Sequence, residues 1–588
     1  MSAPGGACPA TIVGVLHYTK SLRALVPLIV LGVAARADAQ RPDPAFACNG
    51  EIVSRVEIQP SPPPYGGVAQ KWQAAARAAG MHHATTTPHV VAAFLSLAPG
   101  KACTERRRSE SERVLRAQPF LSDASVRVAP DTGGMVSVVV STTDEIPVLV
   151  SARFRGVMPE SFSLGNENIN GGALRLTGRI ERGRSYQTAF GVGLEQDALF
   201  GHAFRLVLNA DRYRIGERVV AELEHPFFTD LQRVSWHAGY LTGNGVRGFE
   251  RPARDPLALQ VDDRAWDVSS LMRLFGTRTV GLLGGAVTGR RVDPANAGVL
   301  VADSGLVPDT GSALRGRYQS FKAVRVGILG GVRSVNFTPV NGFEALVGTQ
   351  DVMRGAALGV FAARGISRFG TEDYLLSSAM YAGTATPNFL LATLTLVEGA
   401  RDQTGGQWNS IVGSNYTTMF WGRAPGAVLL LSNQYSGGSR SLLPLQVTFA
   451  DRDGGLIGYH YSGLAGERRN VAHGELRFSG ESLIRRADVG LAAFTEVGTL
   501  WAGDAPYGVN ATRASVGFSL LAAYPTRSKR MYRADFAFPL TRAGEGKGRI
   551  EVRFSSLDRT QTFATEPRDV SAARTGTEPS RLFAWPTR

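Results

Sequence analysis

The most informative absence in this sequence of 588 residues is that of a long apolar run. The longest run, Ala24–Ala35, has twelve residues, whereas a helix that crosses a membrane needs about 20. We therefore predict no transmembrane helix. The run is instead typical of a secretory signal peptide, because Lys20 and Arg23 precede it and Ala37-Asp38-Ala39 follows it as a small-x-small cleavage signal. We expect residues 1–39 to be removed by cleavage near Ala39–Gln40.

Cysteine is also scarce, with three residues in the whole chain. Cys8 would leave with the signal peptide, and Cys48 and Cys103 would then remain in an oxidising compartment. We expect these two residues to form a disulfide, which would stabilise the fold by roughly 3–4 kcal/mol through its constraint on the unfolded chain. Lipidation of Cys48 is disfavoured, because the leucine expected three positions earlier is missing and the apolar run ends too far upstream.

Charge of one sign is not concentrated anywhere, although the net charge is +14. The 64 basic and 50 acidic residues are interspersed, and there is no basic tail and no aromatic-basic module. Electrostatic recognition of phosphate backbones needs a basic patch or stripe. We therefore expect no nucleic-acid partner.

Motifs for cofactors and catalysis are missing or incomplete. Gly243–Gly248 fits G-x-G-x-x-G, but no strand–loop–helix context surrounds it, so we predict a glycine-rich loop. His82, His83 and His89 are close in sequence, but no acidic or cysteine pattern completes a metal site. Gly437–Ser441 lacks the second glycine of a nucleophile elbow. We therefore predict no catalytic residue, no metal and no cofactor, and a protein that is not an enzyme.

Residues 40–147 have the pattern of a small α/β domain. Alternating apolar residues indicate strands, an Ala-rich stretch with Trp72 favours a helix, and Asp131–Gly134 has the chemistry of a hairpin turn. The expected order is β-α-α-β-β, with elements at 52–58, 68–79, 110–115, 126–128 and 136–140.

Residues 148–556 contain no convincing helix and many short alternating segments. In one of them, Phe204, Leu206 and Leu208 alternate with polar residues such as Arg205. Each such strand has one apolar and one charged face. A soluble β-sandwich gives the same local pattern, but here it recurs without a break and aromatic residues gather near segment ends. We therefore predict a transmembrane antiparallel β-barrel whose charged face lines the lumen, since only a closed barrel satisfies every strand backbone in lipid.

The polar residues 557–588, rich in Arg and Thr, are predicted to form a flexible tail.

In the first domain, Ser111–Ala124 resembles the stretch of a POTRA domain in which the last helix turns at Pro119-Phe120 into the second strand. POTRA domains are periplasmic β-α-α-β-β units that precede certain outer-membrane barrels. The resemblance implies that one such domain stands before the barrel.

The final third of the chain resembles the barrel of the BamA/TamA superfamily, the bacterial surface antigen family. Gly454–Tyr459 is similar to that family's inward-folded loop, whose hallmark is an Arg-Gly-aromatic triplet. The resemblance implies an inward loop that contains Gly455, Ile457, Gly458 and Tyr459. The strands that follow are matched in order and spacing by segments at 474–478, 493–498, 515–518 and 534–539.

The sequence departs from the family pattern at the loop arginine, where it has Ile457. In the family this arginine reaches acidic residues on the barrel wall, and Glu475 and Glu496 hold the matching positions here. The arginine pair at 468–469 is a candidate substitute. Two interpretations stay open: the carboxylates bind wall arginines such as Arg477, or they dock the inward loop.

The resemblance implies a barrel of sixteen strands, with about 26 residues for each strand and its connection. It also implies insertion or translocation of polypeptides at the outer membrane of a Gram-negative-type bacterium, with residues 40–147 in the periplasm. Expected partners are outer-membrane lipids, unfolded β-barrel or secreted clients, and periplasmic chaperones. The alternative is a passive pore or lipid-handling barrel without assembly activity, and an outer-membrane hydrolase is the weakest hypothesis.

Overall fold

The structure is a computed structural model, and it describes thirteen stretches of the chain. They are 48–63, 85–155, 158–182, 189–251, 257–276, 278–302, 305–402, 406–450, 454–460, 462–480, 487–541, 550–557 and 562–576. All of them belong to one compact unit, Phe46–Arg588. The predicted signal peptide at 1–39 and the predicted helix at 68–79 lie outside the described residues.

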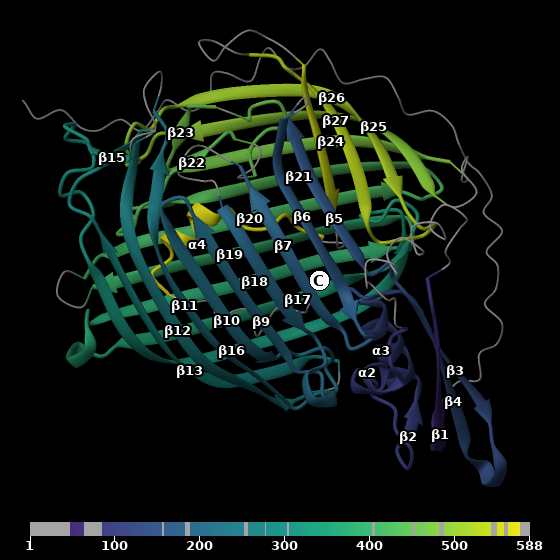
Figure 1. The fold of residues 1–588 in the computed structure, drawn as a ribbon. Helices are drawn as coiled ribbons and strands as arrows, with labels where there is room; N and C mark the ends of the chain where they lie inside the picture. Colours follow the sequence, from purple (N-terminus) through teal and green to yellow (C-terminus); the bar gives the residue numbers. More distant parts are fainter. Residues whose placement is uncertain are drawn as a thin grey trace, which may run out of the picture. The chain divides into compact units, whose positions relative to one another are not determined.

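The N-terminal module is a four-stranded mixed sheet with two helices (Figure 1). Its elements are β1 (Asn49–Ser61), α2 (Pro88–Ala93), β2 (Ala102–Thr104), α3 (Glu105–Arg116), β3 (Leu121–Pro130), the 3-10 turn η1 (Thr132–Gly134) and β4 (Val136–Asp144). The strand order is β2-β1-β4-β3, in which β1 runs parallel to β4 and the other pairs are antiparallel. The three expected strands, the second expected helix and the hairpin turn are confirmed. Neither the short strand β2 nor the short helix α2 was predicted.

Helix α3 begins and ends where its sequence favours it. The Thr104 hydroxyl accepts a hydrogen bond from the backbone N–H of Arg107, which caps the first turn. Glu105 lies in the first turn and Arg116 in the last, so both charges complement the helix dipole. Leu115 on its inner face is fully buried in the apolar core of the module.

The described strands that follow the module form a closed antiparallel barrel (Figure 1). The strands of the ring are β5 (Val148–Arg155), β6 (Met158–Ile169), β7 (Leu174–Glu181), β8 (Ala189–Gln196), β9 (Arg205–Tyr213), β10 (Gly216–His225), β11 (Val234–Phe249), β12 (Leu257–Phe275), β13 (Val280–Pro294), β16 (Phe321–Asn341), β17 (Thr349–Gly365), β18 (Asp373–Thr386), β19 (Phe389–Asp402), β20 (Trp408–Gly422), β21 (Gly426–Ser439), β24 (Arg468–Ser479), β25 (Asp488–Trp501), β26 (Ala511–Ala523), β27 (Met531–Pro539) and β28 (Glu551–Leu557). The barrel class is therefore confirmed.

The described residues also form smaller elements that are not strands of the ring. They are the hairpin of β14 (Val299–Ala302) and β15 (Gly305–Pro308), the two-residue ladder of β22 (Val447–Thr448) with β23 (Ala465–Gly466), and the 3-10 turns η2 (Leu199–Gly201) and η3 (Ser367–Phe369). Since β13 pairs directly with β16, the hairpin β14–β15 is not part of the ring. The described pairings thus give twenty ring strands, more than the sixteen that the resemblance implies. Each strand with its connection therefore takes about 20 residues instead of about 26, because the connections are shorter than that estimate assumed.

The two faces of the barrel strands differ in polarity as the alternation predicts. On β12, Trp266 and Val268 are exposed, Val268 to 58%, whereas Asp267 between them is buried. The same division holds on β9, where Leu208 is exposed and Arg205 is buried. A soluble sandwich would bury the apolar face between two sheets. Here that face covers the outside of a closed sheet, which is the arrangement that a lipid environment requires.

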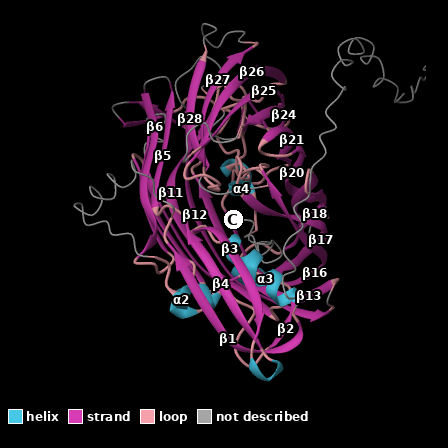
Figure 2. Ribbon diagram, turned by 90° about the vertical axis from the view of Figure 1, so that its right-hand side faces the viewer, coloured by secondary structure: helices cyan, strands magenta, loops and turns pink. Residues whose placement is uncertain are grey.

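Helices are few in the described part of the chain: α2 and α3 of the module, and α4 (Arg568–Ala573) near the end (Figure 2). None of the described helices is long and apolar enough to cross a membrane.

The C-terminal residues differ from the prediction of a flexible polar tail. Residues 562–576 are described and include α4, in which Val570 and Ala573 are fully buried. Their polar composition suggested a chain that cannot bury enough apolar surface to fold. The barrel lumen instead offers charged partners, so a polar segment can pack there. Residues 577–588 lie outside the described residues.

The module contacts the barrel through charged groups. The Arg116 guanidinium pairs with Asp351 on β17 at 2.8 Å between Nε and Oδ2, and Arg113 lies over the Phe337 ring at 4.0 Å from its centroid. Lys529, in the turn between β26 and β27, donates to the carbonyl oxygen of Arg116. Burial lowers the pKa of Lys529 to about 8.

Candidate functional site

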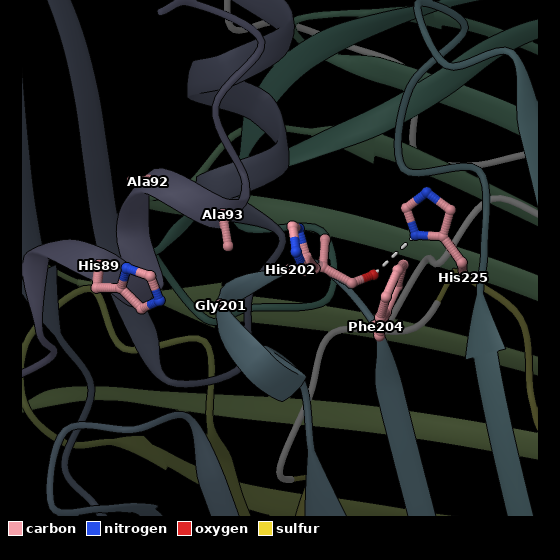
Figure 3. A pocket seen from close by; sticks show the side chains of 8 residues that line it. His89, Ala92, Ala93, Gly201, His202, Phe204 and His225 are labelled. Carbon is pink, nitrogen blue, oxygen red and sulfur yellow. Dashed lines mark hydrogen bonds between the residues drawn. The ribbon is translucent and has the colours of Figure 1, made fainter.

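Three histidines line a cavity of about 490 Å³ where α2 faces the barrel (Figure 3). His89 comes from α2, His202 follows η2, and His225 ends β10. Both imidazole nitrogens of His225 have hydrogen-bonding partners within the protein: Nδ1 lies 3.0 Å from the Ala203 carbonyl oxygen, and Nε2 lies 3.0 Å from Nε2 of Gln232. A metal site needs three convergent ligands, and the described residues contain no such group.

The sequence analysis also singled out the neighbouring histidines His82 and His83 and the glycine-rich stretch Gly243–Gly248. His82 and His83 lie outside the described residues. Gly243–Gly248 was predicted to be a loop and is instead part of the strand β11, where it pairs with β10 and β12. The high glycine content favoured a loop, because glycine weakens a strand interior, but the segment is held in the strand by the ladder with β12, which is continuous from Val234 to Phe249.

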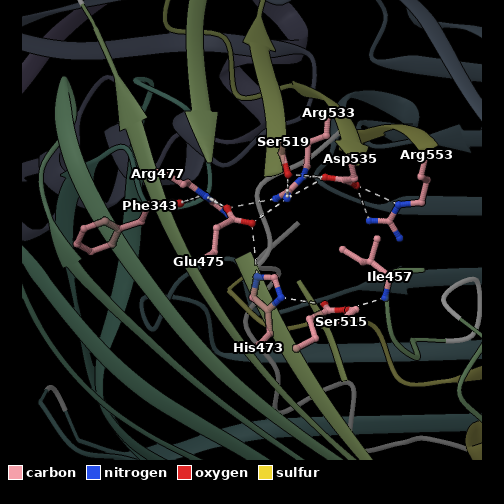
Figure 4. Close-up of polar contacts among 11 residues, drawn as sticks. Phe343, Ile457, His473, Glu475, Arg477, Ser515, Ser519, Arg533, Asp535 and Arg553 are labelled. Carbon is pink, nitrogen blue, oxygen red and sulfur yellow. Dashed lines mark hydrogen bonds and ion pairs between the residues drawn. The ribbon is translucent and has the colours of Figure 1, made fainter. Parts of the chain in front are cut away.

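The richest polar cluster lies on the inner face of β24 to β28, and we call it the wall network (Figure 4). It consists of His473, Glu475, Arg477, Glu496, Ser519, Arg533, Asp535 and Arg553. Residues two apart on a strand share a face, which places three of these side chains together on β24 and two on β27. The register between neighbouring strands then brings side chains of different strands together. His473 is opposite Glu496, Ser519 is opposite Asp535, and Asp535 is opposite Arg553.

Glu475 is the centre of one half of the wall network. Its side chain is 1% exposed and accepts from the guanidinium groups of Arg477 and Arg533, the latter at 2.7 Å between Nη2 and Oε2. His473 Nε2 lies 3.4 Å from Oε2 of the same carboxylate. Buried charges are stable only when they are paired and hydrogen-bonded, and Glu475 satisfies both conditions.

Asp535 is the centre of the other half. It accepts from Ser519 Oγ at 2.7 Å, and its oxygens lie 3.1 Å from Arg533 Nη2 and 2.9 Å from Arg553 Nη2. Arg533 therefore bridges Glu475 and Asp535, and the network links β24 with the last strand of the ring.

The segment predicted to fold inward does contact this wall. The backbone N–H of Ile457 donates to Glu496 Oε2 at 2.6 Å, and the other oxygen of Glu496 lies 2.9 Å from His473 Nδ1. The Ile457 side chain packs with Phe494 and Ala537 on the same wall. The loop thus meets the wall through a backbone donor and an apolar side chain.

Tyr459 and two glycines shape the same segment. The Tyr459 hydroxyl oxygen lies 2.9 Å from the Ala514 carbonyl oxygen and 2.7 Å from that of Thr541. Gly458 has φ +96°, and a Cβ there would lie 3.2 Å from Cβ of Ala537, so both backbone conformation and close approach favour glycine. At Gly455 a Cβ would lie 2.1 Å from the Phe449 carbonyl oxygen, which leaves no room for a side chain.

Two interpretations of the wall carboxylates stayed open, binding of wall arginines and docking of the inward loop. Each of them applies to one of the two residues. Glu475 binds Arg477 and Arg533, whereas Glu496 accepts from the inward loop at Ile457. Of the candidate substitute pair, Arg469 donates from Nη1 to the Thr448 carbonyl oxygen, at the start of the loop, at 2.6 Å. The cationic partners of Glu475 come from the wall itself.

Sequence reasoning did not select His473, Arg533, Asp535 or Arg553 as site residues. Their alternation was visible in the sequence, and it correctly placed them on a polar face. The register between strands decides which of these charges meet, and no local signal in the sequence carries that information.

The Cys48 and Cys103 sulfurs are bonded in the structure. The bond joins the start of β1 to β2, two elements that also pair as antiparallel strands. The disulfide therefore ties the edge strand β2 of the module sheet to the start of β1.

No protein-family model and no curated protein matches the chain. Among solved structures, BamA from Haemophilus ducreyi lacking POTRA domains 1–3 aligns at 11% identity over 86% of this chain and 85% of that chain, with a TM-score of 0.34. CdiB from Escherichia coli aligns at 12% identity, 86% and 77% coverage and a TM-score of 0.42, and CdiB from Acinetobacter baumannii at 11%, 86% and 74%, and 0.40.

These likenesses are too distant to bear on function, so the assignment of the fold rests on the ladders of the chain itself. A mixed α/β module followed by a closed antiparallel barrel is the architecture that the sequence resemblance to the BamA/TamA superfamily implies. That expectation is confirmed at the level of the fold.

Proposed function

We propose that this chain is an outer-membrane barrel of the BamA/TamA type that inserts or translocates β-rich polypeptides, with its module in the periplasm. The observation that carries the proposal is the short seam between the first and last ring strands. In the described residues, β28 pairs with β5 only through Arg553 with Arg155 and Phe554 with Phe154. By contrast, β16 pairs with β17 from Arg325 with Gly365 to Asn341 with Thr349.

The seam provides a template for an incoming strand. A strand edge with unpaired N–H and C=O groups recruits another strand, and in lipid each unpaired group costs several kcal/mol. Along β5 and β28, most residues do not pair with each other. A client β-strand could satisfy these groups as it enters the membrane, without a nucleotide.

The module offers a second strand edge. β1 pairs with β4 from Val53 to Ser61, but on its other side β2 covers only the Asn49–Ile52 end. In the described part of the chain, the remaining edge of β1 has no strand partner. An extended polypeptide could add to this edge through backbone hydrogen bonds before it reaches the barrel.

The alternative, a passive pore or lipid-handling barrel without assembly activity, depends on the missing loop arginine. Because Ile457 docks on Glu496 through its backbone N–H, the loop contact does not require that arginine. We therefore rank polypeptide insertion first. Catalysis has no part in the proposal, and the expected clients are unfolded β-barrel or secreted polypeptides.

A reversible lock on the seam tests the proposal. Phe154 and Phe554 are register partners, so F154C with F554C places two thiols within disulfide reach. We expect the oxidised pair to abolish insertion of a β-barrel client into vesicles that carry the protein, and a reductant to restore it.

The matched control is F518C with F536C, another pair of facing aromatic residues, on β26 and β27. Because that ladder is already continuous, the oxidised control should insert clients normally under the same oxidant and reductant. Equal insertion by the locked and unlocked seam would refute the proposal. Unchanged insertion together with altered permeability of depleted cells would favour the passive pore.

A further inference from the structure

Residues 562–576, which we call the C-terminal segment, return into the ring after β28 (Figure 1). The fully buried Val570 and Ala573 of α4 belong to an apolar cluster with Val412 and Val471 on the inner wall. Tyr459 and Leu456 of the inward loop belong to the same cluster. The segment is thus packed against both the wall and the loop.

The end of the C-terminal segment is held by a buried carboxylate. Glu398 on β19 is 1% exposed, and its Oε1 accepts from the backbone N–H of Thr575 at 2.6 Å, from its hydroxyl at 3.1 Å, and from the N–H of Gly576 at 3.0 Å. A Cβ on Gly576 would lie 2.8 Å from Cδ2 of Leu375 and 2.9 Å from Oε2 of Glu398. A larger residue therefore does not fit at this position without displacement of the wall side chains.

Two wall arginines bind the backbone carbonyls of the segment. Arg325 Nη1 donates to the Thr575 oxygen at 2.8 Å, and Arg290 Nη2 donates to the Ala572 oxygen at 3.1 Å. Each arginine also has a carboxylate partner on the wall, Asp373 for Arg325 and Asp263 for Arg290. These two charges would therefore stay paired if the segment left, whereas all the described hydrogen bonds of the Glu398 side chain go to the segment.

The middle of the segment reaches toward the opposite part of the wall. Its beginning packs on β18 and β20, where the Phe563 ring lies 6.1 Å from the Tyr381 ring and Ser414 donates to Glu566. Arg568 Nη2 lies 3.8 Å from Glu181 Oε1 on β7, far around the ring from β19. Residues 562–566 line a cavity of about 510 Å³ together with inward side chains that include Arg179 and Tyr416. The segment therefore reaches across the lumen between distant strands.

We propose that the C-terminal segment is a removable plug of the lumen, and that Glu398, Arg325 and Arg290 form a binding site for a polypeptide turn of the type Arg-Thr-Gly. The chain's own segment occupies this site. The wall recognises backbone N–H and C=O groups and a residue without a side chain, so a peptide of the same sequence binds in its place. The inference goes beyond client insertion, because it concerns the passage of ions through the lumen.

Cleavage after assembly provides the test and avoids any defect in folding. A protease site is placed between Leu557 and Thr562, the barrel is folded in lipid, and the site is then cut. We expect the released fragment to wash out, as followed by mass spectrometry, and the single-channel conductance to rise severalfold. A synthetic peptide of residues 562–576 should restore the low conductance, and the same peptide with Gly576→Val should not.

A full-length variant tests the binding site directly. Glu398→Ala should give frequent transitions to the higher conductance, because it removes three hydrogen bonds to the segment. The matched control is Asp267→Ala, which removes another buried lumen carboxylate, paired with His237 on the neighbouring strand, and should leave the conductance low. A fragment that cannot be washed out, or a conductance that is unchanged after it leaves, would overturn the proposal. Client insertion is assayed separately, so failure of either proposal leaves the other standing.

Discussion

The module and the barrel of this protein use the same strand alternation in opposite ways. In the module, apolar residues such as Val53 and Val138 face inward against the helices, and polar residues face water. In the barrel, charged residues such as Arg325 and Glu475 are buried inside and residues such as Val268 are exposed outside. The comparison teaches that alternation determines two faces per strand, and the surrounding solvent determines which face is turned inward.

The largest expected effect comes from the buried charges that distinguish the barrel. Glu475→Ala leaves Arg477 and Arg533 without their shared carboxylate, so we expect a loss of about 3–5 kcal/mol in the free energy of unfolding. Denaturant unfolding of the protein in detergent measures it. The control is Glu372→Ala, which breaks an exposed pair with Arg364 and should lower the free energy of unfolding far less. Equal losses in the two variants would contradict the distinction.

The disulfide distinguishes the module from the barrel in a second way. Cys103→Ser should lower the stability of the module by roughly 3–4 kcal/mol, because the bond limits the unfolded chain around a long loop. The unfolding transition of the barrel should stay unchanged, which tryptophan fluorescence of the barrel strands can monitor. Thiol labelling of the unfolded, non-reduced mature protein should detect no free thiol, and two labelled thiols would contradict the pairing.

Charge placed on the outer face tests the solvent of the barrel. Val268→Arg on β12 should destabilise the folded barrel in lipid by about 2–4 kcal/mol, since a lipid-facing arginine is costly near the bilayer midplane. Ile52→Arg in β1 makes the same kind of change at an exposed site of the module. That site faces water, so its stability should stay within about 0.5 kcal/mol. If both variants behave alike, the outer face of the barrel does not contact lipid.

The smallest effect concerns pH. Burial raises the pKa of Asp144, the last residue of β4, to about 6, above the usual value of an aspartate in an unfolded chain. The folded state then binds the proton more tightly, so this group favours folding at low pH, and that contribution is lost as the pH rises from about 4 to 6. Asp144→Asn should flatten the melting temperature of the module over this range. An unchanged slope in the variant would assign the pH dependence to another group.

Local sequence signals predicted the elements of the fold well. Alternation placed Arg205 inside and Leu208 outside, and the Asp and Gly residues after β3 marked the turn before β4. The same signals could not show that Arg533 bridges Glu475 and Asp535, because these residues are brought together by register between strands. The prediction of a flexible tail at 557–588 used composition alone, and it did not consider a polar lumen as a packing environment.

The sequence by itself determined which side chains share a face and where the turn before β4 lies. Only the tertiary structure decided the number of ring strands, the short seam, the donor that reaches Glu496, and the place of residues 562–576 in the lumen. The reason is physical: a period of two is a property of one strand, whereas closure, register and the filling of the lumen arise from contacts between residues hundreds of positions apart.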